Sequence, residues 1–176
     1  MSVRHVLLWS GGFDSTAVLL SMVDDPKNFP HVRVVSCGLK NAANYEEDKA
    51  ARAAIRTSLV ESGDSMSHIE FARELELDID VYGGTQSAVW AWLAAMNVGN
   101  QDDDTTIVCG YIRGDDFWHT KSEWEWTVDY MVKLANPKGV HFMFPLEWTT
   151  KKENVAKYLK HPSVFYKLSW VATPKR

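Results

Sequence analysis

A short glycine-rich turn between two apolar runs constrains this chain more than any other feature. The turn is Ser-Gly-Gly-Phe-Asp-Ser-Thr at 10–16, between Val-Leu-Leu-Trp at 6–9 and Ala-Val-Leu-Leu at 17–20. Two adjacent glycines allow a sharp bend and let a ligand approach without a Cβ in the way. Ser15 and Thr16 supply hydroxyls where a helix would begin. The pattern predicts a strand, a tight turn and a helix whose N-terminal amides form an anion site.

The turn differs from two common phosphate-binding loops. It has no lysine after the glycines, as P-loop nucleoside triphosphatases require, and an aspartate stands inside it. It also lacks the third spaced glycine of a dinucleotide-binding loop. We therefore expect a phosphate-bearing ligand of another kind. A turn that serves only to begin the helix is the structural alternative.

Length and charge narrow the classes of protein to consider. The 176 residues suit one domain, 1–176, and a hydrophobic content of 45% supports a globular core. The formal net charge of −4 argues against general nucleic-acid binding, which normally needs a basic face. A small anionic ligand needs only a local site and is compatible with this charge.

The cysteines and the apolar runs favour a cytoplasmic protein. Cys37 and Cys109 are the two cysteines, and both lie in strand-like apolar surroundings that favour buried free thiols. Their number and spacing support neither a disulfide framework nor a structural zinc site. No basic segment followed by a long apolar one opens the chain, so we expect no leader sequence, and no apolar run reaches the ~20 residues that span a membrane. We expect no membrane association.

Hydrophobic patterns predict strands that alternate with helices. β-branched and apolar runs indicate five strands, at 6–9, 31–37, 67–71, 105–111 and 140–146. Helices are expected over 15–23, 45–60, 85–96, 122–135 and 150–159. The last opens on Thr150 and Glu153 in the spacing of a capping box. In the helix 45–60 we expect Arg52 to face outward and an apolar face to point inward, made of Ala50, Ala53, Ala54 and Leu59.

This alternation predicts an α/β fold with an open, parallel, five-stranded sheet and helices on both faces, a Rossmann-like architecture. In such sheets ligands bind beyond the carboxyl ends of the strands, where the strand order reverses. The crevice there is expected to bring together Ser10, Cys37, Gly38, Gly110, Tyr111, Leu146 and Glu147.

The turn 10–15 resembles the SGGxDS signature of the PP-loop ATP pyrophosphatases, which split ATP into AMP and pyrophosphate while activating a substrate. Later segments resemble one branch of that group, the 7-cyano-7-deazaguanine synthases. They are Ser-Cys-Gly-Leu-Lys at 36–40 with Glu46 and Ala50 downstream, Pro-Leu-Glu-Trp-Thr-Thr-Lys-Lys-Glu at 145–153, and Tyr-Lys-Leu-Ser-Trp at 166–170. The resemblance covers nearly the whole chain and implies an adenine nucleotide alpha-hydrolase-like fold.

The chain departs from that family in two places. The family's final tryptophan precedes a cluster of cysteines that holds zinc, whereas Trp170 is followed by Val-Ala-Thr-Pro. No zinc is expected, and either apolar packing replaces the metal or the substrate pocket is remodelled. Leu39 stands where the family has glutamine, and residues 110–119 differ from its substrate segment. ATP binding therefore carries over better than the identity of the acceptor.

The resemblance implies roles for the turn. Its cofactor-binding residues would hold the β and γ phosphates of ATP, and they are Ser10, Gly11, Gly12, Phe13, Ser15 and Thr16. Asp14 and Ser15 are expected to take part in catalysis, and Asp14 is either a cap at the helix start or an indirect magnesium partner. Mg²⁺ is expected because a hard cation neutralises the charge on the leaving pyrophosphate.

Residues outside the turn would complete the ATP site. Lys151, a further catalytic candidate, would reach the leaving pyrophosphate as a mobile positive charge, and a solvated surface lysine is the alternative. Cys37 and Gly38 would present backbone groups to the adenine edge. Gly110 belongs to the same cofactor-binding set.

The polar and aromatic segment after the fourth strand is the expected acceptor site. A planar heterocycle would stack on an aromatic ring, and a carboxylate can bond the amino and imino groups of a guanine-like edge. The candidate substrate-binding residues are Arg113, Asp115, Asp116, Trp118 and His119. The alternative is an ordinary polar loop with Trp118 on the core and His119 exposed. Four tryptophans at helical positions are expected to pack rather than to bind ligand: Trp90, Trp92, Trp124 and Trp126.

The resemblance implies an ATP-dependent ligase that forms AMP, pyrophosphate and a C–N bond. It would adenylate a carboxylate or carbonyl oxygen of a deazaguanine-like substrate, and ammonia would displace AMP. Its partners would be a purine-like small molecule and ammonia, and a homodimer is one option that the sequence leaves open. Two other functions stay open: a related enzyme with another acceptor, and a nucleotide-binding module without turnover.

Overall fold

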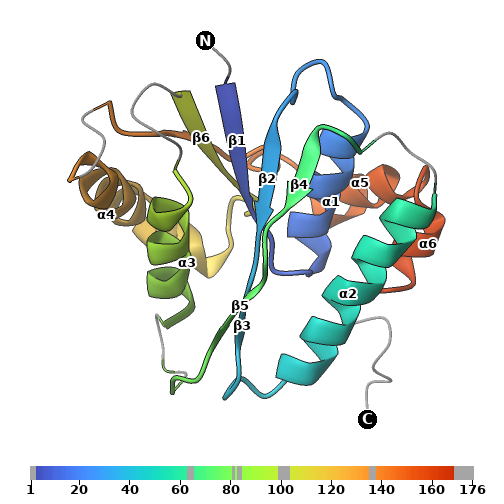
Figure 1. Ribbon diagram of the computed structural model, residues 1–176, viewed down its shortest axis with the longest axis horizontal. Coiled ribbons are helices and arrows are strands. Elements are labelled where there is room, and N and C mark those ends of the chain that lie inside the picture. The colour runs from blue at the N-terminus through green and yellow to red at the C-terminus, as the bar shows by residue number, and fades with distance from the viewer. Residues whose placement is uncertain are drawn as a thin grey trace.

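A five-stranded parallel sheet forms the centre of the computed structural model, which describes residues 3–62, 66–80, 82, 85–98, 104–134 and 138–168 (Figure 1). The strands are β1 (Val3–Leu8), β2 (Val32–Val35), β4 (Ile69–Phe71), β6 (Asp104–Cys109) and β7 (His141–Met143). Their order is β4-β2-β1-β6-β7, and every neighbouring pair is parallel. The predicted α/β fold with an open parallel sheet is confirmed.

Helices cover both faces of this sheet, with α3 and α4 on one face and the other α-helices on the opposite one (Figure 1). They are α1 (Phe13–Val23), α2 (Tyr45–Glu61), α3 (Thr85–Met96), α4 (Lys121–Lys133), α5 (Lys151–Asn154) and α6 (Pro162–Phe165). Two short 3-10 helices, η1 (Asp116–Thr120) and η2 (Val155–Tyr158), precede α4 and follow α5. The predicted capping box is confirmed, because Thr150 and Glu153 each accept a hydrogen bond from the other's amide.

The central strand separates two hydrophobic cores. Successive side chains of a strand point to opposite faces of the sheet. Leu7 and Trp9 therefore pack in the core under α1 and α2, whereas Val6 and Leu8 pack in the core under α3 and α4. All four side chains are almost fully buried. The turn after β1 consequently starts between the two helix layers.

A second sheet of two strands, which the hydrophobic pattern did not predict, extends beyond the carboxyl edge of the first (Figure 1). β3 (Cys37–Leu39) follows β2 after Ser36, and β5 (Leu75–Leu77) follows β4. The predicted strand 31–37 is thus interrupted at Ser36, whose carbonyl accepts a hydrogen bond from the Leu75 amide.

The predicted inward face of α2 is wrong in part. Its buried residues are Ala51, Arg52, Ile55 and Leu59, whereas Ala50 and Ala53 are exposed. The prediction followed hydrophobicity alone. Arg52 is buried because its guanidinium finds polar partners in the interior, namely Glu74 and the Ser10 carbonyl.

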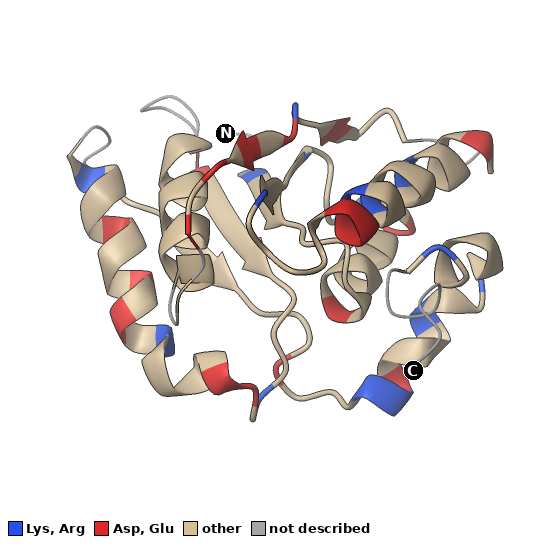
Figure 2. Ribbon diagram, turned by 90° about the horizontal axis from the view of Figure 1, so that it is seen from below, with Lys and Arg blue, Asp and Glu red and all other residues tan. Residues whose placement is uncertain are grey.

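Charged side chains are interspersed on the surface. Figure 2, which looks onto the carboxyl edge of the sheet, shows acidic and basic residues mixed along the helices. Within the described part of the chain, no helix is both long enough and apolar enough to cross a membrane.

Gly110 permits a close approach between the end of β6 and α1. A Cβ at Gly110 would lie 2.6 Å from Ser15 Cα and 2.8 Å from Ser15 N. Because backbone atoms cannot swing aside, we expect Gly110→Ala to lower the free energy of unfolding by about 1–3 kcal/mol. Urea unfolding followed by circular dichroism measures this change. Gly12→Ala is the control, since its Cβ would meet only Ser10 Oγ, at 3.3 Å; equal losses would contradict the prediction.

Candidate functional site

A crevice lies at the carboxyl edge of the main sheet, where the strand order reverses. From β1, the strands β2 and β4 lie on one side, and β6 and β7 lie on the other. Three cavities surround the turn after β1, and the middle one shares lining residues with each of the other two. We call them the α2/α3 cavity, the loop cavity and the α5 cavity, with volumes of about 230, 180 and 510 Å³. This is the predicted position of a ligand site.

The turn is held in shape by its own serines. Ser10 Oγ lies 2.9 Å from Ser15 Oγ and accepts a hydrogen bond from the Gly12 amide at 3.2 Å. Ser15 Oγ also accepts from the Ser10 amide at 3.3 Å. Gly11 has a φ of 84°, in the left-handed region that glycine adopts freely. These hydrogen bonds and the left-handed glycine together set the shape of the turn.

The first turn of α1 faces the loop cavity. Gly12 is its N-cap, no side chain caps it, and residues Gly12 to Ser15 line the cavity. The first amides of a helix have no carbonyl partner within that helix and attract anions. Asp14 lies two residues after this N-cap, so it is not the N-cap residue itself, and its role as an indirect magnesium partner stays a prediction.

Asp14 lines both the loop cavity and the α5 cavity. Burial raises the pKa of its carboxyl above the usual value; the charge of Lys151 opposes this shift, and the charge of Asp115 adds to it. Asp14 Oδ1 is buried and has no hydrogen-bond partner among the described residues. Lys151 lines the α5 cavity from an exposed position. Two carboxylates and a lysine thus gather around the start of α1.

Two residues of the turn face the core. Thr16 is fully buried, and its Oγ1 accepts a hydrogen bond from the Trp9 indole at 3.0 Å, so its side chain does not reach the crevice. The Phe13 ring stacks on Tyr158 with 5.0 Å between centroids, and the Phe13 carbonyl accepts from the Tyr158 hydroxyl. These contacts tie the turn to η2, and they leave Phe13 partly exposed to the loop and α5 cavities.

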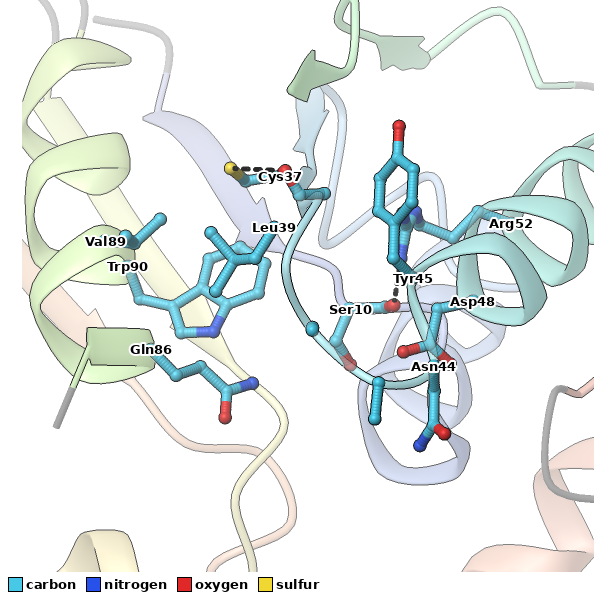
Figure 3. Close-up of a pocket in the computed structure, with 13 residues that line it drawn as sticks. Ser10, Cys37, Leu39, Asn44, Tyr45, Asp48, Arg52, Gln86, Val89 and Trp90 are labelled. Atoms are coloured by element: carbon cyan, nitrogen blue, oxygen red, sulfur yellow. Dashed lines mark hydrogen bonds between the residues drawn. The ribbon is translucent and has the colours of Figure 1, made fainter. Parts of the chain in front are cut away.

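Arg52, which the sequence pattern placed outward, anchors the turn from α2 (Figure 3). Its side chain is 4% exposed, and its Nη1 donates to the Ser10 carbonyl at 3.0 Å. Nε and Nη2 donate to Glu74 Oε1 at 3.1 and 2.5 Å. The side-chain stem lies so close to Gly11 that a Cβ there would be 2.5 Å from Arg52 Cγ. Sequence reasoning missed this residue because its partners are remote in the chain.

The α2/α3 cavity lies between side chains of α2 and α3 (Figure 3). Tyr45 and Asp48 line it from α2, Gln86 and Trp90 line it from α3, and β3 runs between the two helices. Trp90 is buried yet lines this cavity and the loop cavity. The helical pattern that predicted its packing carried no signal for this second role. Trp124 is packed as expected, whereas Trp92 and Trp126 are 38% and 67% exposed.

Cys37 and Gly38 line the α2/α3 cavity, as expected for groups beside a bound base. Burial raises the pKa of the Cys37 thiol to about 11, so this thiol stays protonated at neutral pH. Burial also raises the pKa of Cys109. Both cysteines are free and buried, as predicted.

The proposed acceptor segment sends one residue into the crevice. Asp115 lines the loop cavity, and its Oδ2 accepts a hydrogen bond from the Ile112 amide at 3.0 Å. The Trp118 indole donates to the Ile112 carbonyl, and its ring packs on Phe144. The other candidates are exposed, and they are Arg113, Asp116 and His119. This arrangement fits the alternative of a polar loop with Trp118 on the core and His119 exposed.

Comparison with known proteins adds no family assignment. No protein-family model matches the chain, and no curated protein matches it. Two residues of the C-terminal segment that resembles the 7-cyano-7-deazaguanine synthases, Ser169 and Trp170, lie outside the described residues.

The pKa of Asp14 predicts how this residue changes stability with pH. Because its folded-state pKa is raised above 3.8, its contribution to stability is complete below pH 3.8 and is lost as the pH rises through the raised pKa. Asp14→Asn cannot ionise, so we expect this variant to be more stable than wild type at pH 7. The difference should shrink towards pH 4, and urea midpoints measured across this range test it.

Asp25→Asn is the control for this pH series. Hydrogen bonds from Asn28 lower the pKa of Asp25, so the sign is opposite and Asp25→Asn should lose stability at pH 7. The prediction for Asp14 fails if Asp14→Asn is also less stable than wild type at pH 7.

Removing the Arg52 guanidinium should loosen the turn. Breaking a buried ion pair costs about 3–5 kcal/mol, and since Glu74 is 28% exposed we expect Arg52→Met to lose about 2 kcal/mol. Urea unfolding measures the loss. Arg56→Met, one turn further along α2, is the control: Arg56 is exposed and lies over the Phe71 ring. Similar losses for the two variants would rule out an anchoring role for Arg52.

Proposed function

We propose that this protein is an ATP-dependent, AMP- and pyrophosphate-forming ligase of the PP-loop type. The observation that supports this most is the turn Ser-Gly-Gly-Phe-Asp-Ser at the point where the strand order reverses, with the first turn of α1 facing a cavity. A helix N-terminus in this position favours a phosphate group. Asp14 and Asp115, which line the same cavity, provide the acidic groups that a metal–nucleotide complex needs.

ATP would lie along the crevice with its β and γ phosphates on the turn. The backbone from Gly12 to Ser15 would hold these phosphates, and Lys151 would approach them from the α5 cavity. The adenine would enter the α2/α3 cavity beside Cys37 and Gly38. Aromatic rings at Tyr45 and Trp90 line that cavity and suit a planar base.

The carboxylates fit a magnesium ion that accompanies ATP. Asp14 Oδ1 is buried without a partner, and Asp115 lines the same cavity. Mg²⁺ in nucleotide sites is usually held by one or two carboxylates together with substrate phosphates. Asp14 and Asp115 would hold it here, and the ion would neutralise negative charge on the phosphate oxygens.

Catalysis would rest on position and charge. A carboxylate or carbonyl oxygen of the acceptor attacks the α-phosphorus of ATP, the bond to the bridging oxygen breaks, and pyrophosphate leaves onto the turn. Ammonia then attacks the activated carbon and displaces AMP. No protein nucleophile takes part, and the protonated thiol of Cys37 agrees with that. The acceptor we propose is a planar, deazaguanine-like molecule.

A second candidate function is a nucleotide-binding module without turnover. One observation favours it: of the five acceptor candidates on 113–119, Asp115 alone is among the residues that line the crevice cavities. For either function we propose a cytoplasmic location, since free buried thiols at Cys37 and Cys109 suit a reducing compartment.

Pyrophosphate release from ATP and Mg²⁺ tests the proposed function. It is measured with and without carboxyl-deazaguanine and ammonium, and the products are weighed by mass spectrometry. Release that depends on carboxyl-deazaguanine, with AMP as co-product, would support the ligase. ATP binding without release would favour the module or another acceptor, and no ATP binding would overturn both candidate functions.

Lys151 and its neighbour Lys152 provide a matched pair of variants. Both line the α5 cavity, but the charge of Lys151 is the one that acts on Asp14. We expect Lys151→Gln to slow pyrophosphate release on the order of 100-fold, as loss of one charge-stabilising group does, and Lys152→Gln to change it little. Equal rates for the two variants in the pyrophosphate assay would remove Lys151 from the mechanism.

A further inference from the structure

Unpaired buried polar atoms are concentrated beside the turn. Among the described residues, four buried side-chain atoms have no hydrogen-bond partner: Asp14 Oδ1, Asn154 Oδ1, Asn154 Nδ2 and His5 Nδ1. Three of them therefore belong to Asp14 and Asn154. Buried polar groups are nearly always paired in native structures, so each exception calls for a reason.

Asn154 lies beside Asp14. Its amide favours the ionised form of the Asp14 carboxylate, although the pair does not meet hydrogen-bond geometry in the structure. Asn154 is fully buried, so its side chain is not exposed to bulk solvent. Asn154 Nδ2 is an unpaired donor and Asp14 Oδ1 is an unpaired acceptor, so the two groups are chemically complementary.

The fold holds Asn154 in this place from both sides. Before it, the capping box of Thr150 and Glu153 sets the start of α5, and the backbone N–H of Asn154 donates to the Thr150 carbonyl at 3.0 Å. After it, Tyr158 stacks on Phe13 and bonds its carbonyl. The site is thus rigidly framed, yet the side chain within the frame makes no bond. Fold stability alone does not explain an amide here, because an apolar side chain of similar shape would avoid the unpaired groups.

We propose that Asn154 is a positioning residue that orients the Asp14 carboxylate for the bound nucleotide. When the nucleotide binds, Asn154 Nδ2 donates to Asp14 Oδ1, and the other carboxylate oxygen is directed to the loop cavity. The short helix α5 then delivers two functions, the mobile charge of Lys151 and the anchor of Asn154. This inference rests on the proposed nucleotide-binding function.

The test compares nucleotide affinity with stability in Asn154→Leu. We expect the Kd for ATP with Mg²⁺, measured by calorimetry, to rise at least about 10-fold, the effect of losing one hydrogen bond to a charged group. The thermal midpoint without ligand should stay the same or rise, since the unpaired amide is gone. If Asn154→Leu does not fold, Asn154→Ala serves the same affinity comparison.

Asn97→Leu is the matched control. Asn97 is partly buried just after α3, and both ends of its side-chain amide are bonded: Oδ1 accepts from Arg33 Nε at 3.1 Å, and Nδ2 donates to the Leu93 carbonyl at 2.8 Å. The same substitution there should lower the thermal midpoint and leave the Kd unchanged, the reverse of the pattern at Asn154.

A double-mutant cycle shows whether Asn154 acts through Asp14. In an Asp14→Asn background, Asn154→Leu should change the Kd by less than about 2-fold, because the carboxylate that it orients is already absent. Additive effects of the two substitutions on the Kd would overturn the inference. An unchanged Kd in Asn154→Leu alone would also overturn it, whether or not the thermal midpoint of that variant is lowered. If wild type binds ATP in these experiments, such results leave the proposed function standing. If wild type binds no ATP, both fall.

Discussion

The crevice depends on how closely the end of β6 approaches the first turn of α1. At Gly110 no side chain separates the two backbones, and any Cβ would collide with the backbone of Ser15. This contact joins two segments that lie on opposite sides of the point where the strand order reverses. It also brings Asp115, which follows β6, to the same cavity as Asp14. A wider separation would leave the two carboxylates in different surroundings.

The turn itself is a backbone structure held by side chains from elsewhere. Arg52 bonds the Ser10 carbonyl from α2, and Tyr158 bonds the Phe13 carbonyl from η2. Each anchor takes up a carbonyl group, so the amides at the start of α1 are the groups that remain for an anion. Contacts of this kind restrict the turn and lower the cost of ordering a site on binding. In the proposed function, the two anchors would therefore support binding of the phosphates without touching them.

Buried polar atoms are normally hydrogen-bonded, but those of Asp14 and Asn154 beside the crevice are not. The half-buried Asp14 carboxyl has a raised pKa and a buried, unpaired Oδ1, and the buried side-chain amide of Asn154 next to it is also unpaired. Both the capping box before Asn154 and the stacked ring after it obey the usual rules. Natural proteins tend to break such rules where function requires it. The unpaired atoms of Asp14 and Asn154 therefore indicate the same candidate site as the glycine-rich turn.

Features whose partners are close along the chain could be predicted from the amino-acid sequence. Hydrophobic period predicted the five strands of the main sheet, adjacent glycines predicted the turn, and the Thr150–Glu153 spacing predicted the cap. Tertiary structure decided the features whose partners are far away. Arg52 turns inward because Glu74 and Ser10, 22 and 42 residues distant, meet its guanidinium. The pairing of β3 with β5 likewise depends on packing between distant segments. So does the position of Asp115 in the crevice, and the spacing of residues along the chain does not encode such packing.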